Sequence, residues 1–329
     1  MLFTNSNGQE FVIQANAIDG VVSYTRDNGK EVWRLSVPNG VESSATIIKD
    51  RLFFGGNDGQ FYSVDANNGK VLWTFPTRIE NLAEPLLDEG VLYFLTGNNS
   101  VYALDAASGK QLWLYVRQDP NILSIRGGSK PAIRNGTLYV GFSDGYVCAL
   151  IAKNGAVKWE KQLNRNKKFK DIDVSPLVDG EFLYLHGYDD QVYSLRAATG
   201  DIVWKAEKGG YGNILSLGDK LYFASTNNEF VAIDKGTGKR IWAHSTSEGI
   251  ATSASLYKGL VVFGESQGEL KFLDSGTGRL IQSFNPGRGI MSPPTVDEKN
   301  NLVFFISNEA NIYALKVGWD WPKAIPYLR

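Results

Sequence analysis

The chain has 329 residues, 43% of them hydrophobic and 21% charged, and its 34 Lys and Arg nearly balance its 35 Asp and Glu. This composition supports a large apolar core and excludes a wholly disordered chain. A net charge of -1 lacks the basic excess of a phosphate-binding surface, so we expect no nucleic-acid partner. One cysteine and two histidines exclude an intrachain disulfide and disfavour a metal centre, and we expect neither metal nor cofactor.

A short motif recurs along the chain, in which a glycine is followed four residues later by a large side chain. The seven motifs end at Trp33, Trp73, Trp113, Trp159, Trp204, Trp242 and Gln282. Successive ends are separated by 40, 40, 46, 45, 38 and 40 residues. A period near 40 is typical of an array of small modules.

The interior of one period has the pattern of a β-meander. In residues 42–75, four short runs (SATII, RLFF, QFYSV and KVLWTF) alternate with clusters of Gly, Asn and Asp. Such runs predict four antiparallel strands separated by turns. The glycine that follows Asn, Ser or Thr suits the turn between the third and fourth strands, because it adopts positive φ without a Cβ clash.

Counting the hairpins between second and third strands predicts eight modules. The first strand of the first module is LFTNS at the start of the sequence, and the eighth module lacks the Gly–x3–Trp turn and ends in GWDWP. Modules of four strands bury their faces only against neighbours, so we expect an all-β, eight-bladed β-propeller over residues 1–329, with each Trp on an outermost strand and packed between blades. The expected blades are approximately 1–40, 41–80, 81–120, 121–165, 166–210, 211–248, 249–288 and 289–325.

The repeat resembles the tryptophan-docking motif of the PQQ-like propeller superfamily. VDANNGKVLW and LDAASGKQLW match that motif closely, and the resemblance covers nearly the whole chain. The acidic position is occupied by Asp65, Asp105, Asp234 and Asp274. The resemblance implies an architecture and not an activity.

The two longest intervals are consecutive and place extra residues between Trp113 and Pro131 and between Trp159 and Pro176. Each insertion joins the outer strand of one blade to the inner strand of the next. In a four-stranded meander, these connections lie on the same face as the turns between second and third strands. Two adjacent enlarged loops on a rigid scaffold predict a binding site.

Within the first insertion, Leu123 and Ile125 directly precede Arg126. Apolar residues beside an arginine are typical of interface hot spots, although Leu123 and Ile125 could instead be strand residues that face the core. In the second insertion, Asp171 and Asp173 project to one side if the segment is extended. These two carboxylates could hold Arg126 or meet a cation of a partner, and the alternative is strand-edge capping.

The pair LSIRGGS and KDIDVSP resembles the paired loops of the BamB family in the outer-membrane β-barrel assembly (BAM) complex. This resemblance implies a non-catalytic scaffold at the periplasmic face of the outer membrane, which docks a POTRA domain of BamA and assists outer-membrane protein folding and insertion. The family positions that match are Leu123, Ile125, Arg126, Asp171 and Asp173. Unfolded outer-membrane protein strands are a second partner to consider. Members of the family are lipoproteins, whereas MLFTNSNGQE has no signal-peptide features, so we expect membrane association only through a lipid anchor outside this sequence.

Two other functions share the propeller motif. A PQQ-dependent quinoprotein dehydrogenase would bind the quinone with calcium and typically carries vicinal cysteines, whereas Cys148 is single and lies in the strand-like run YVCAL, where we expect it to be buried. Most carboxylates occupy expected turns, and the alternative is that oxygen ligands from several blades converge on a calcium ion. A generic peptide- or glycan-binding propeller is the third alternative. We expect no enzymatic activity.

Overall fold

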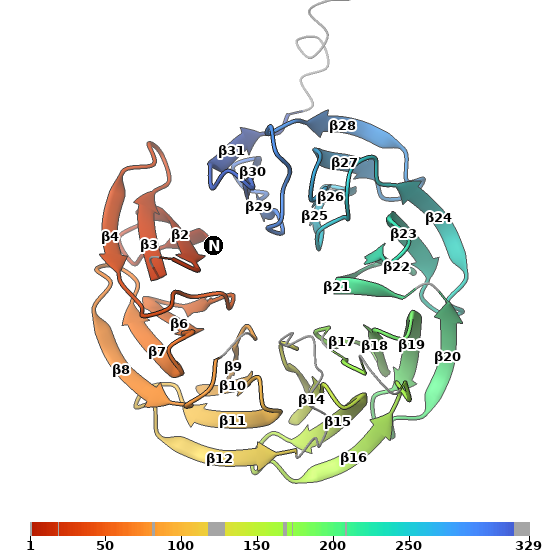
Figure 1. The fold of residues 1–329 in the computed structure, drawn as a ribbon, viewed down its shortest axis with the longest axis horizontal. Coiled ribbons are helices and arrows are strands. Elements are labelled where there is room, and N and C mark those ends of the chain that lie inside the picture. Colours follow the sequence, from red (N-terminus) through yellow and green to blue (C-terminus); the bar gives the residue numbers. More distant parts are fainter. Residues whose placement is uncertain are drawn as a thin grey trace, which may run out of the picture. The chain divides into compact units, whose positions relative to one another are not determined.

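The computed structural model describes residues 2–18, 20–80, 83–117, 129–166, 170–172, 174–207 and 209–318. These residues form strands and turns, without helices (Figure 1). Accordingly, none of the described residues forms a helix that is long and apolar enough to cross a membrane. The chain divides into two compact units, residues 1–214 (unit 1) and residues 215–329 (unit 2).

Unit 1 contains five antiparallel sheets of four strands, in which the strands follow chain order. The first sheet comprises β1 (Leu2–Thr4), β2 (Glu10–Asn16), β3 (Gly20–Thr25) and β4 (Glu31–Leu35), and the second comprises β5 (Thr46–Ile48), β6 (Arg51–Gly55), β7 (Gln60–Asp65) and β8 (Val71–Pro76). The third comprises β9 (Leu86–Asp88), β10 (Val91–Leu95), β11 (Ser100–Asp105) and β12 (Gln111–Val116). The fourth comprises β13 (Ala132–Arg134), β14 (Thr137–Gly141), β15 (Tyr146–Ile151) and β16 (Val157–Gln162), and the fifth comprises β17 (Leu177–Asp179), β18 (Phe182–Gly187), β19 (Gln191–Arg196) and β20 (Ile202–Glu207).

Three further sheets follow, the first of which begins with β21 at the boundary between the units. The sixth sheet comprises β21 (Gly210–Leu217), β22 (Lys220–Ser225), β23 (Glu229–Asp234) and β24 (Arg240–Ser245). The seventh comprises β25 (Ser255–Tyr257), β26 (Leu260–Gly264), β27 (Leu270–Asp274) and β28 (Leu280–Phe284). The eighth has three strands within the described residues, β29 (Thr295–Asp297), β30 (Leu302–Ile306) and β31 (Ile312–Lys316). The expected meander is therefore confirmed, including the first strand LFTNS, whose residue Phe3 pairs with Phe11.

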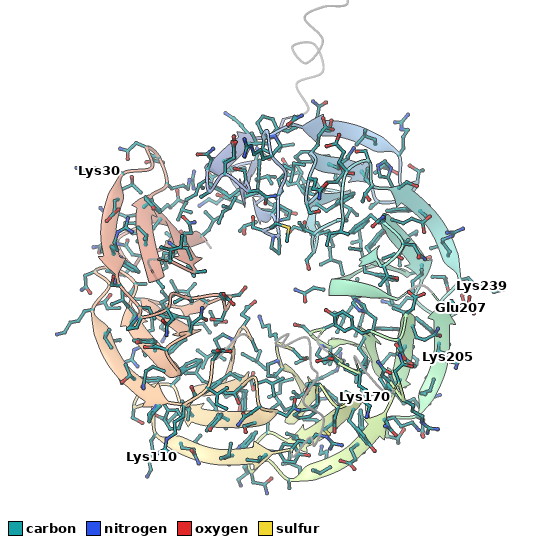
Figure 2. All side chains as sticks on the ribbon, in the orientation of Figure 1. Lys30, Lys110, Lys170, Lys205, Glu207 and Lys239 are labelled. Atoms are coloured by element: carbon teal, nitrogen blue, oxygen red, sulfur yellow. The ribbon has the colours of Figure 1, made fainter. Side chains whose placement is uncertain are left out.

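The turn between the third and fourth strands has the geometry that the sequence predicts. In the second sheet, Gly69 has a φ of 75° and its N–H donates to the Asp65 carbonyl oxygen at 2.8 Å. The Asp65 carboxylate accepts the N–H of Asn67 at 2.9 Å, which accounts for an acidic residue at this position. A β-bulge between Ser63 and Val64 accompanies the turn, and the other four-stranded sheets of unit 1 carry the same shift. Lys30 and Lys110, labelled in Figure 2, follow the corresponding glycines of the first and third sheets.

Five repeat tryptophans dock onto the next sheet through their indole N–H groups: Trp33, Trp73, Trp113, Trp159 and Trp242. The indole N–H of Trp33 donates to the Ala66 carbonyl oxygen at 2.9 Å, and Trp113 bonds Ala152 in the same way at 2.8 Å. A Cβ on Gly69 would lie only 2.7 Å from the Trp33 ring. The motif glycine is thus required twice, for its positive φ and for the indole that covers it. The expected packing of the tryptophans between blades is confirmed for these five.

The apolar core lies between neighbouring sheets. One cluster in unit 1 joins Phe3, Val21 and Trp33 of the first sheet to Leu52 and Phe54 of the second, and further clusters follow between later sheets. In unit 2, a cluster joins the seventh and eighth sheets. The sheets are therefore mutually dependent, as expected for modules that cannot bury a face alone. Cys148 is fully buried in one of these clusters, as the sequence predicts.

Candidate protein-docking site

The two insertions connect the sheets that the repeat spacing predicts. The first connector, residues 117–131, runs from β12 to β13, and the second connector, residues 163–176, runs from β16 to β17. The second connector starts against the turn between β14 and β15, because the N–H groups of Leu163 and Asn164 donate to the Gly145 carbonyl oxygen at 2.9 and 3.2 Å. It therefore lies on the face of the second-to-third-strand turns, as expected.

Most of the predicted site residues lie outside the described residues. This applies to Leu123, Ile125 and Arg126 of the first connector and to Asp173 of the second. Of the five predicted positions, the structure describes Asp171. The docking role of all five therefore stays a prediction, while the described ends of both connectors show how these segments are anchored.

At its start, the first connector is held to the fourth sheet by a clamp, the ion-paired cluster of Arg117, Asp144 and Glu160. The Arg117 guanidinium forms ion pairs with Asp144 and, at 2.8 Å, with Glu160. Its central carbon lies 4.0 Å from the centroid of the Tyr146 ring, within cation–π range. The backbone N–H of Arg117 donates to the Asn99 carbonyl oxygen of its own sheet at 3.1 Å. Arg117 thus joins the third sheet to the fourth at the point where the connector leaves β12.

Burial and hydrogen bonds together set the protonation states of Arg117 and of the neighbouring Cys148. Burial opposes the charge of Arg117, but the hydrogen bonds to Asp144 and Glu160 outweigh it, so the pKa of the guanidinium lies above its ordinary value. Burial also raises the pKa of the Cys148 thiol to about 12, although the neighbouring Arg117 charge lowers it. The thiol lies 3.7 Å from the guanidinium and is protonated at neutral pH. Cys148 therefore packs beneath the clamp and has no nucleophilic thiolate.

Hydrogen bonds link the end of the first connector to the second. The Ser129 hydroxyl donates to the Val174 carbonyl oxygen at 3.1 Å, and the Lys130 N–H donates to the Ser175 hydroxyl oxygen at 3.2 Å. The Lys130 ammonium also pairs with Glu84, which precedes the third sheet, at 2.5 Å. Because the two connectors share these bonds, the C-terminal ends of both are held in one arrangement.

The middle of the second connector is embedded in the core. Ile172 is fully buried, and its N–H donates to the Phe142 carbonyl oxygen of the fourth sheet at 3.0 Å. A Cβ on Gly141 would lie 2.2 Å from the Ile172 carbonyl oxygen, so only glycine permits this approach. Asp171 is also fully buried, and its carbonyl oxygen accepts the N–H of Tyr188 from the fifth sheet at 3.2 Å. The segment therefore bridges the fourth and fifth sheets.

The same bridge recurs at other connections. Between the first and second sheets, the N–H of Val41 donates to Asn16 and the Gly40 carbonyl accepts from Asn57. In unit 2, Ile290 and Gly289 make the equivalent bonds. Asp171 thus occupies a position that is glycine in both of these repeats. Aligning the connectors by their buried apolar residue, and not by the tryptophan, would have revealed this structural position from the sequence.

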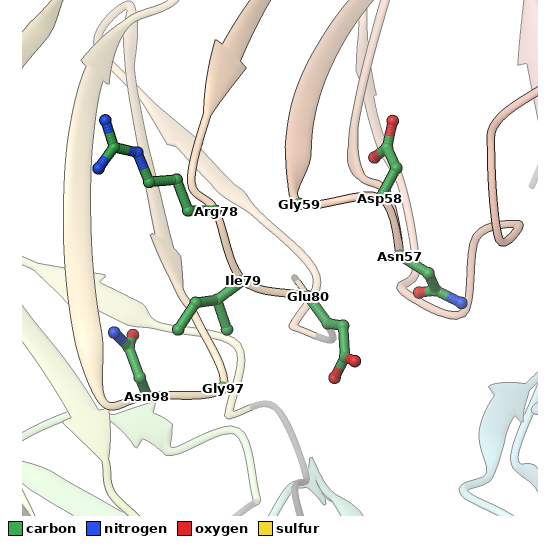
Figure 3. A pocket seen from close by; sticks show the side chains of 8 residues that line it. All are labelled: Asn57, Asp58, Gly59, Arg78, Ile79, Glu80, Gly97 and Asn98. Atoms are coloured by element: carbon green, nitrogen blue, oxygen red, sulfur yellow. The ribbon is translucent and has the colours of Figure 1, made fainter.

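A polar pocket opens on the connector face of unit 1, between the second and third sheets (Figure 3). Its volume is about 460 Å³, and it is lined by Asn57, Asp58, Gly59, Arg78, Ile79, Glu80, Gly97 and Asn98. The Asp58 carboxylate accepts the Tyr62 hydroxyl at 2.5 Å and the Gln60 N–H at 3.1 Å. Burial raises the pKa of Tyr62, and the bond to Asp58 raises it further. This acid therefore stabilises its own hairpin.

The pKa values of both histidines lie below the ordinary value because both imidazoles are buried, to different extents. Burial lowers the pKa of His186 to about 3, which keeps the imidazole neutral. Burial also lowers the pKa of His244, and the Lys271 charge adds to this effect. Within the described ranges, no three His, Cys, Asp or Glu side chains are grouped to hold a metal ion.

Comparisons with known proteins identify similar sequences. The family model described as outer membrane protein assembly factor BamB matches residues 18–244 and 176–320. BamB of Salmonella typhimurium is 31% identical over 92% of this chain and 82% of its own length. BamB of Shewanella oneidensis is 27% identical over 88% of this chain and 78% of its own length.

Solved structures support the fold. The crystal structure of BamB from Moraxella catarrhalis superposes with a TM-score of 0.80 and 22% identity, over 97% of this chain and 94% of that one. A europium-containing methanol dehydrogenase reaches a TM-score of 0.74 at 14% identity, over 93% of this chain and 80% of that one. The fold is accordingly the expected all-β, eight-bladed, PQQ-like β-propeller. At these identities, the structural similarity concerns the fold alone.

Proposed function

The chain belongs to the BamB family of outer membrane protein assembly factors, and from this premise we propose that it is a non-catalytic scaffold of the BAM complex. In this role, it docks a POTRA domain of BamA through the two connectors and assists the folding and insertion of outer-membrane proteins. It acts at the periplasmic face of the outer membrane, where a lipid anchor of the precursor would hold it.

The observation that carries the proposal is the anchoring of the two connectors. The first is fixed at its start by Arg117 and at its end by Ser129 and Lys130, and the latter two bond to the second connector. A loop whose ends are already held loses less conformational entropy when a partner binds. Leu123, Ile125 and Arg126 lie between these fixed ends in the sequence, so a partner that binds them would meet a segment whose two ends are already held.

The buried state of Asp171 refines the role of the second connector. An inaccessible carboxylate does not meet a cation on a partner directly. We therefore retain for Asp171 the two roles within the protein that its sequence context suggested, holding Arg126 or capping a strand edge. Asp173 keeps the role of a direct contact in the proposal.

The test is the affinity of isolated POTRA domains for the Arg126→Glu variant, measured by calorimetry. Reversing a central interfacial arginine is expected to weaken binding by about 30- to 1,000-fold, because the partner groups lose their cation and meet a like charge. Arg134→Glu is the matched control, since Arg134 is exposed and lies at the end of β13 that is farther along the strand from the first connector. Unchanged affinity of Arg126→Glu, with unchanged thermal unfolding, would reject the docking site.

A further inference from the structure

The outermost strand of the third sheet has an unusual solvent-facing surface. In β12, every second side chain is apolar and exposed: Leu112, Leu114 and Val116 are 50%, 41% and 53% exposed. The side chains between them face the fourth sheet, where the Trp113 indole bonds Ala152 and the Tyr115 ring packs 5.9 Å from the ring of Phe142. One face of β12 is thus docked, and the other carries a continuous apolar stripe, Leu112–Leu114–Val116.

The backbone of β12 also has an unpaired edge. In the third sheet, β12 is the terminal strand and pairs with β11, and no other described strand pairs with it. An edge strand directs about half of its N–H and C=O groups away from the sheet, where they accept an added strand. An apolar stripe beside such an edge favours pairing further, because the added strand buries apolar side chains against it.

The other outermost strands of unit 1 carry the residues that normally protect an edge. The exposed positions of β20 include Lys205 and Glu207, which Figure 2 labels, and those of β16 include Lys158 and Glu160. In β8, the exposed series ends in Pro76, which donates no hydrogen bond. By contrast, β12 has no charge, proline or glycine among its six residues. The exposed apolar residue directly before the tryptophan recurs in the repeat, as Val32, Leu72 and Val203 show, whereas the further exposed apolar residues Leu114 and Val116 extend the series in β12.

From this arrangement, we propose that β12 receives an extended strand of alternating apolar and polar residues, as in an incompletely folded outer-membrane β-barrel protein. The inference rests on the proposed function, which supplies the class of substrate. Transmembrane β-strands alternate apolar and polar side chains over about 10 residues. Paired with β12, such a strand would place its apolar side chains along Leu112–Leu114–Val116 and bond the free backbone groups.

The test measures binding of two fluorescent peptides by anisotropy. Both are about 10 residues long and share one composition, but only the first alternates apolar and polar residues. The first is expected to bind more tightly, and Leu114→Lys is expected to weaken its binding by about tenfold or more, because two or three cross-strand pairs are lost. The matched control is Val203→Lys on β20, which is 43% exposed and should leave binding unchanged.

Three outcomes would overturn the inference: equal binding of both peptides, an equal effect of both lysine variants, or no binding to the wild type. Sedimentation of the unliganded protein adds a fourth, since a dimer that Leu114→Lys dissociates would assign the stripe to a second copy of the chain. Titration with POTRA domains is done on the same variants. Retained POTRA affinity together with lost peptide binding separates this inference from the proposed function.

Discussion

Each unit holds a connector with a cluster of charges, but the two clusters are built differently. In unit 1, the connector itself supplies the cation, since Arg117 reaches Asp144 and Glu160 on the fourth sheet. In unit 2, both charges belong to the seventh sheet: the Lys271 ammonium lies 3.6 Å from the Glu265 carboxylate. The connector contributes only Ser247, whose N–H and hydroxyl donate to Glu265 at 2.8 and 2.9 Å.

Burial separates the two clusters further. Glu265 is fully buried and the Lys271 side chain is 8% exposed, whereas Glu160 in the Arg117 cluster is 48% exposed. A buried ion pair contributes little net stability but is costly to break, because a lone charge then remains without water. A partly exposed charge is hydrated when its partner is removed. The two clusters should therefore respond very differently to loss of one member.

The largest effect is expected for Glu265→Ala. This variant leaves the Lys271 ammonium with Glu269, at 3.7 Å, and with the Ser247 hydroxyl, to which it donates at 3.1 Å, and it removes both bonds from Ser247 to Glu265. We expect a loss of about 3–5 kcal/mol in the free energy of unfolding at neutral pH, measured with urea. The double variant Glu265→Ala/Lys271→Met should lose less than Glu265→Ala alone. A double loss equal to the sum of the single losses would show that the two charges are not coupled.

A smaller effect is expected for Arg117→Met, which keeps much of the side-chain volume. It removes the ion pairs and the cation–π contact, while Asp144 retains some access to water at 12% exposure. We expect a loss of about 2 kcal/mol in the free energy of unfolding. Glu160→Gln is the control within the cluster and should cost less than about 1 kcal/mol, because Glu160 is half exposed. A loss as large as that of Glu265→Ala would contradict the distinction between the clusters.

The smallest effect is a change in the titration of His244. Burial lowers the pKa of this imidazole, the Lys271 charge lowers it further, and Glu265 raises it. Removing the ammonium in Lys271→Met should therefore raise the pKa of His244 toward its ordinary value of 6.5. NMR titration of the imidazole resonances measures the shift. Arg117→Met should leave the His244 titration unchanged, and a fall in the pKa in Lys271→Met would refute the assignment.

The fold was predictable because its determinants are local and repeated. The Gly–x3–Trp spacing placed every turn between third and fourth strands where the glycines have positive φ. It also predicted the tryptophan packing, which the bond from Trp33 to Ala66 exemplifies. The burial of Cys148 followed from its place in an apolar strand. Each of these features repeats about every 40 residues, so the pattern is legible without coordinates.

The candidate site was predictable only in outline. The repeat spacing located both connectors, but it gave no sign that Asp171 is buried in a bridge between sheets. Arg117 was also missed, because nothing in its local sequence indicates that it reaches Asp144 across the gap between two sheets. The stripe on β12 required the strand register, since Leu112 and Leu114 belong to the same apolar run as the docked Trp113.

By itself, the sequence determined the number of modules, their strands, the turn glycines and the place of the two insertions. Those features depend on backbone preferences and on side-chain periodicity within a few residues. Tertiary structure decided which charges pair, which aspartate is inaccessible and which strand edge is left apolar. These depend on contacts between residues such as Arg117 and Asp144, which lie 27 positions apart and meet only when one sheet packs on the next.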